Sequence, residues 1–208
     1  STFAIWGVLY LWFIVWAGFQ VAALMSHKIG IRMEPMLEKI GWLFAYACLL
    51  NIGWLFAWHW EQLLVSVVVM ANLLYILIQL NLAANVGWSS SGKLEKWLQQ
   101  LPFGIYQGWI TVALIANVTA WLVSLGWSGG GLPAWGWATI MAITGGSIAI
   151  FMVFWQRNWG HGLAVAWALY GIYLERNQAT DEGSNHVALV AITLSAAILL
   201  LLVVRYRK

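Results

Sequence analysis

The sequence predicts an all-α integral membrane protein, a bundle of about seven transmembrane helices. Of its 208 residues, 62% are apolar and only 8% are charged, where an ordinary soluble domain has roughly 25% charged residues. The apolar residues form long unbroken runs, as membrane helices require, rather than the alternating pattern of a barrel strand. The distribution of basic residues between the intervening loops supports the same number of spans.

The predicted helices follow from the apolar runs in chain order. They lie at about 3–25, 40–59, 62–84, 103–126, 134–156, 161–174 and 186–204. The sixth is shorter than the roughly 20 residues that a span needs, so a re-entrant or buried segment remains an alternative there.

Polar and turn-forming segments separate these helices. They are a charged loop at 27–39, a tight turn near Glu61, a polar loop at 87–96, a Gly-rich turn at 128–133, a turn at 156–160 and an acidic loop at 175–186.

Seven spans divide the basic residues unevenly between the two sides of the membrane. One side receives Lys28, Arg32, Lys39, Lys93, Lys96, Arg157, Arg205, Arg207 and Lys208, and the other receives Arg176. Cytoplasmic loops carry the excess of Lys and Arg, so we predict a multi-pass protein with a cytoplasmic C-terminus. The basic residues lie in loops and the tail rather than in one patch, and we expect no nucleic-acid partner.

The chain enters its first apolar run directly at Ser1. This start has no basic segment and no small-residue cleavage site, so it is not a signal peptide. We expect that an N-terminal segment precedes it in the natural protein. The single cysteine, Cys48, excludes an intrachain disulfide framework.

The uncharged stretch at 101–125 carries polar side chains inside an apolar span. Trp109, Ala113 and Asn117 follow at four-residue spacing and therefore share one helix face. On the second predicted helix, Asn51, Trp54 and Trp58 share a face in the same way. A buried amide needs a partner, which leaves two interpretations open. Either each amide clamps a neighbouring helix, or Asn51, Trp54, Trp109 and Asn117 line one polar and aromatic pocket.

Catalytic and metal-binding patterns find no support, and we predict a protein that is not an enzyme. On this topology all four histidines lie at span ends or in loops, with His59 and His186 near the outer surface and His27 and His161 near the inner one. A bis-histidine haem site is therefore not expected, although a single axial histidine on a chlorin stays open. Glu61, beside His59, fits a solvated turn better than a proton-transfer pair.

Three segments resemble the TspO family, also called the translocator protein, tryptophan-rich sensory protein or peripheral benzodiazepine receptor family. They are FAIWGVLY at 3–10, LLNIGWLFAW at 49–58 and LPFGIYQGWITVALIAN at 101–117. The residues that match the family patterns are Trp6, Tyr10, Asn51, Trp54, Trp109, Ala113 and Asn117.

The resemblance implies a TspO-like core at 1–127, without the family's first helix, and a C-terminal extension of about three helices at 128–208. A larger subgroup of tryptophan-rich proteins, some labelled lantibiotic transporter permeases, has such an extension. Family ligands are porphyrins, sterols and aromatic drugs, so the resemblance implies that the seven matching residues line the ligand pocket. The family's proline-rich loop is absent, and Pro102 stands seven residues before Trp109 instead of four.

We therefore predict a membrane protein that binds a tetrapyrrole, isoprenoid or sterol-like lipid in a pocket lined by Trp and Asn, without a chemical step. The sequence identifies no cofactor with certainty and is compatible with a bound tetrapyrrole, carotenoid or lipid. Expected partners are the lipid bilayer and a hydrophobic small molecule, with a homodimer or a membrane complex also open. The alternatives are an accessory or structural subunit of a larger membrane complex and, third, a small-molecule transporter.

Overall fold

A computed structural model describes residues 2, 4–25, 27–88 and 96–206. In these ranges the regular structure is helical throughout, which confirms the predicted all-α class. The elements are α1 (Ala4–Met25), α2 (His27–His59), α3 (Leu63–Ala83), the π-helical turn η1 (Lys96–Gln100), α5 (Leu101–Ser124), α6 (Ala134–Phe154), α7 (Trp159–Arg176) and α8 (Ser184–Tyr206).

Six helices in the described part of the chain are long and apolar enough to cross a membrane. They are α1, α2 from Ile40 onward, α3, η1 with α5, α6 and α8. The seventh α-helix, α7, has 18 residues and extends the short predicted helix at 161–174 at both ends. At roughly 1.5 Å per residue it is about 27 Å long, and it joins the end of α6 to the start of α8.

The predicted charged loop at 27–39 is wrong, because α2 is continuous from His27 to His59. Lys, Glu and Met, which favour helix, each occur twice in this segment, and neither Gly30 nor Pro35 ends the helix. A helix need not end where the apolar residues end, and the apolar part of α2 begins at Ile40. Of the predicted loop at 87–96, residues 89–95 lie outside the described ranges.

The remaining turns lie near their predicted places. Glu61 and Arg157 adopt positive φ values of 55° and 52° in the α2–α3 and α6–α7 turns. Three glycines with positive φ, at 129–131, form the α5–α6 turn. We call the end formed by the turns at 60–62, 125–133 and 177–183 the acidic end. The opposite end, with the turns at 84–88 and 155–158 and the end of α8, is the basic end.

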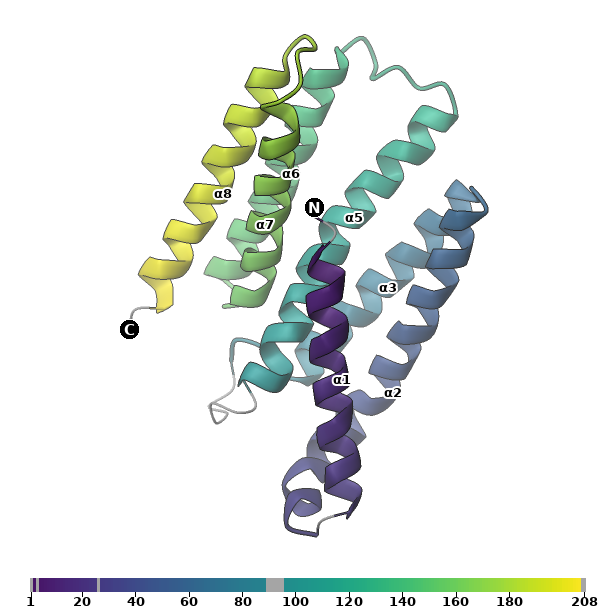
Figure 1. The fold of residues 1–208 in the computed structure, drawn as a ribbon, viewed down its shortest axis with the longest axis vertical. Coiled ribbons are helices and arrows are strands. Elements are labelled where there is room, and N and C mark those ends of the chain that lie inside the picture. The colour runs from purple at the N-terminus through teal and green to yellow at the C-terminus, as the bar shows by residue number, and fades with distance from the viewer. Residues whose placement is uncertain (1, 3, 26, 89–95, 207–208) are drawn as a thin grey trace.

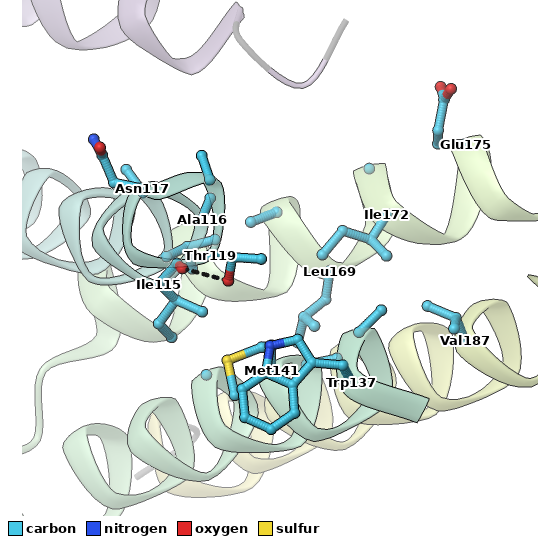
Figure 2. A pocket seen from close by; sticks show the side chains of 18 of the residues that line it. Ile115, Ala116, Asn117, Thr119, Trp137, Met141, Leu169, Ile172, Glu175 and Val187 are labelled. Atoms are coloured by element: carbon cyan, nitrogen blue, oxygen red, sulfur yellow. Dashed lines mark hydrogen bonds between the residues drawn. The ribbon is translucent and has the colours of Figure 1, made fainter. Parts of the chain in front are cut away.

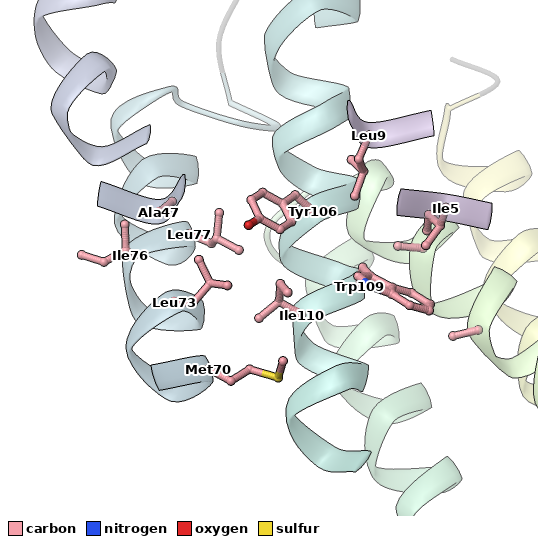
Figure 3. Packing of buried hydrophobic residues seen from close by; sticks show 12 residues of the cluster. Ile5, Leu9, Ala47, Met70, Leu73, Ile76, Leu77, Tyr106, Trp109 and Ile110 are labelled. Atoms are coloured by element: carbon pink, nitrogen blue, oxygen red, sulfur yellow. The ribbon is translucent and has the colours of Figure 1, made fainter. Parts of the chain in front are cut away.

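The helices form two groups that share α5 (Figure 1). α1, α2 and α3 lie on one side of α5, and α6, α7 and α8 lie on the other. One apolar cluster joins the first group to α5 and α7 through residues such as Leu9, Leu73, Leu77 and Ile110, as Figure 3 shows. A second cluster, which includes Val153, Val165 and Ile198, packs α6, α7 and α8 together. Toward the acidic end, α5 diverges from α6 and α7 (Figure 1).

Candidate ligand cavity

Small residues bring α5 and α7 into backbone contact near the basic end. A Cβ placed on Gly108 would lie 2.6 Å from the carbonyl oxygen of His161. A Cβ on Gly160 would lie 2.7 Å from the carbonyl oxygen of Leu101, and one on Gly104 would meet Oδ1 of Asn158. Close contact of this kind is typical of glycines spaced four apart in membrane helices. It fixes the point from which the two helices diverge.

A buried network of polar side chains surrounds this contact. Asn158 caps α7 by accepting a hydrogen bond from the backbone N–H of His161 at 3.0 Å. Its Nδ2 donates to Oε1 of Gln107 at 3.2 Å and to Oδ1 of Asn81 at 3.4 Å. The network therefore ties α3 and α5 to the start of α7.

His161 belongs to the same network, and its side chain is more deeply buried than the sequence predicted. It stands at the start of a helix, as predicted, but its side chain is only 1% exposed rather than interfacial. Its Nε2 lies 3.3 Å from Oγ1 of Thr111, which itself donates to the carbonyl of Gln107. In the described residues no three His, Cys, Asp or Glu side chains gather as a metal site would require.

A cavity of about 1010 Å³ opens where α5 diverges from α6 and α7. Small side chains leave this space free, since Ala113, Ala116 and Ala120 of α5 line it together with Ala138 and Ala142 of α6. Larger apolar side chains, including those of Met141, Leu169 and Ile172, complete the walls (Figure 2).

Tryptophans from α1, α2 and α5 form one wall of the cavity. Trp6 is at the centre of this group, stacked on Trp54 at 6.2 Å between ring centroids and edge-on to Trp109 at 6.3 Å. Trp54 also stacks on Trp58 at 6.3 Å. All four indoles line the cavity. Such offset and edge-to-face pairs hold aromatic rings in place and leave other faces available for stacking.

The structure brings together five of the seven residues singled out in the sequence. Trp6, Trp54, Trp109, Ala113 and Asn117 line the cavity. Tyr10 and Asn51 are not among the lining residues. Tyr10 stacks on the outer side of the group, 5.5 Å from Trp6, and Asn51 is buried at 8% exposure.

Asn117 also makes the contacts of a helix clamp. Its Oδ1 accepts a hydrogen bond from the Ser66 hydroxyl at 2.8 Å, and its Nδ2 donates to the Met70 sulfur at 3.4 Å. Both partners belong to α3. The amide is therefore committed to holding α5 against α3, while the residue still lines the cavity on its other side.

Sequence reasoning missed the wall that the C-terminal half contributes. Trp127 and Trp137 meet edge-on at 4.6 Å between centroids, and both line the cavity together with Glu175 and Arg176. These residues lie outside the three segments that carry the family resemblance. Their joint role depends on how α6 and α7 pack against α5, which no local pattern reveals.

Seven helices, six of them long and apolar enough to cross a bilayer, define this chain in its described part as a polytopic α-helical integral membrane protein. The sequence model of the TSPO-like protein family matches residues 1–204. The chain therefore belongs to this family, which confirms the resemblance carried by the tryptophan and asparagine motifs. No curated protein and no solved structure matches the chain.

Proposed function

We propose that this protein binds a flat hydrophobic ligand, of the tetrapyrrole, isoprenoid or sterol-like class, in the cavity between α5, α6 and α7, without a chemical step. One observation carries the proposal: a cavity of about 1010 Å³, walled by tryptophans and aliphatic side chains, lies among helices that can span a membrane. Small-molecule sites usually have volumes of roughly 300–1,000 Å³ and mostly apolar walls.

The polar groups of the cavity are few, which suits an apolar ligand with a small polar edge. The Thr119 hydroxyl already donates to the carbonyl of Ile115 at 2.9 Å, and the Asn117 amide is engaged with α3. Affinity would therefore come from stacking on indole rings and from buried apolar area, at roughly 25 cal/mol per Å².

The position of the cavity favours a binding site over a continuous passage. Its lining extends from Trp109 to the turn at 127–134 and to Glu175 and Arg176, at the acidic end. Toward the basic end, the glycine contact and the network around Asn158 fill the space between α5 and α7. A transporter would need a second opening there.

A titration with protoporphyrin tests this proposal. The protein is reconstituted in phosphatidylcholine nanodiscs, and the shift of the porphyrin absorption band is followed. Unlike tryptophan fluorescence, this signal is not changed directly by replacing a tryptophan. We expect saturable binding that Trp54→Phe and Trp109→Phe weaken about three- to tenfold, as loss of indole stacking would. Asn51→Ala, outside the lining, should leave the affinity unchanged.

The matched control is Trp42→Phe, since Trp42 is 86% exposed and does not line the cavity. A spectrum recorded before titration shows whether a pigment already occupies the site. If unoccupied, folded protein shows no saturable binding of porphyrin, sterol or isoprenoid probes, the binding proposal fails. The structural-subunit alternative would then replace it.

A further inference from the structure

The cavity carries a charge near the acidic end that the proposed function does not use. Glu175 lies in the last turn of α7 and lines the cavity. Figure 2 shows Glu175 on α7 beyond Ile172, well apart from Asn117 on α5. Among the described residues, the Glu175 carboxylate has no ion-pair partner.

The neighbouring cation does not neutralise this carboxylate. Arg176 also lines the cavity, but its guanidinium pairs with Asp181 at 3.3 Å. The segments that form this end carry Glu61, Glu175, Asp181 and Glu182 against Arg176. The part of the cavity nearest the acidic end is therefore negative, and the local field favours a cation there.

Aromatic rings at the same end add to this preference. Trp58 is next to the last residue of α2, Trp127 lies in the α5–α6 turn, and Trp137 lies in the first turn of α6. All three line the cavity. Indole faces attract ammonium groups, and tryptophan is the best of the aromatic side chains for this contact.

We infer that the ligand of this cavity is a hydrophobic organic cation, with an apolar body among the helices and an amine or quaternary ammonium at the Glu175 end. This inference rests on the proposed function, since it specifies the ligand of the same cavity. A carboxylate placed at this end would instead meet the Glu175 carboxylate and gain nothing from the indole faces. Protoporphyrin carries carboxylates, so its titration tests only whether the cavity accepts a flat apolar ring, and we expect a cationic ring of the same size to bind more tightly.

Three pyrene probes that differ in one group test the inference: pyrenemethylamine, pyrenemethanol and pyrenecarboxylate. Binding is followed by energy transfer from tryptophan to pyrene in phosphatidylcholine nanodiscs, and empty nanodiscs correct for partition into lipid. We expect the amine to bind about tenfold more tightly than the alcohol, and the carboxylate to bind more weakly than both. The advantage of the amine should shrink with added salt, because the end is exposed.

The variant Glu175→Gln should remove most of the advantage of the amine and leave the affinity for the alcohol unchanged. Glu61→Gln is the matched control, because Glu61 belongs to the same end but does not line the cavity. Equal affinities for amine and alcohol, or an amine advantage that survives Glu175→Gln, would overturn the inference while the cavity proposal stands. If no probe binds saturably above the empty nanodiscs, both the inference and the proposed function fail.

Discussion

Two asparagines in apolar helices, Asn51 and Asn117, differ in their hydrogen bonding. Asn51 and Asn117 are both amides within membrane spans, and both are buried. The sequence predicts that each amide needs a hydrogen-bond partner, but it does not show which of the two amides has one. Asn117 bonds Ser66 and Met70, whereas Oδ1 of Asn51 has no hydrogen-bond partner in the described part of the protein.

This difference predicts opposite effects of the same substitution. Asn117→Leu leaves the buried Ser66 hydroxyl without its acceptor and should lower the free energy of unfolding by about 1–3 kcal/mol. Asn51→Leu removes an unsatisfied carbonyl from an apolar site and should be neutral or stabilising. Unfolding in mixed dodecylmaltoside and SDS, followed by circular dichroism, measures both. Equal losses for the two variants would show that Asn51 has a partner as important as Ser66.

At the scale of the elements, the contact between α5 and α7 determines where the cavity can lie. Gly104 and Gly108 have three residues between them, which is the small-xxx-small spacing of a close helix contact. The sequence does not show that the partner is Gly160 on α7, in a distant part of the chain. Nor does it show that Asn158 caps α7 within the same contact, because both depend on the packing of distant helices.

A Cβ at this contact should separate the two helices. Gly108→Ala places a methyl group 2.6 Å from the carbonyl oxygen of His161, and overpacking of this kind typically costs about 1–3 kcal/mol. Gly53→Ala is the matched control, because the nearest atom to its Cβ would be 3.9 Å away. The same unfolding experiment should show a loss for the first variant and none for the second. Equal stability of the two variants would exclude a tight α5–α7 contact.

At the scale of the whole molecule, hydropathy and charge predicted most of the architecture. Long apolar runs predicted the helices, and the turns followed from glycine, proline and charged residues. The predicted start of the second helix, at about residue 40, was wrong because charged residues alone do not end a helix. The second wall of the cavity could not be predicted, since it exists only where α6 and α7 meet α5. The division at residue 127 stays a prediction.

The distribution of charge also predicts the orientation in the membrane. Lys96, Arg157 and Arg205 belong to the basic end, and Arg176 belongs to the acidic end. We propose that the basic end and the C-terminus are cytoplasmic. In a Cys48→Ala background, a membrane-impermeant maleimide should label Thr180→Cys in intact cells and Lys96→Cys only after permeabilisation. The reverse pattern would invert the topology.

The central claim is tested most directly by measuring the affinity for protoporphyrin after a large side chain has been introduced into the cavity. Ala116 lines the cavity and is exposed to it, so Ala116→Trp should occupy the ligand's space and weaken binding by about tenfold or more. Ala196 on α8 is exposed but does not line the cavity, and Ala196→Trp should retain the wild-type affinity. Saturable binding that Ala116→Trp leaves unchanged would contradict the account, because the ligand would then lie elsewhere.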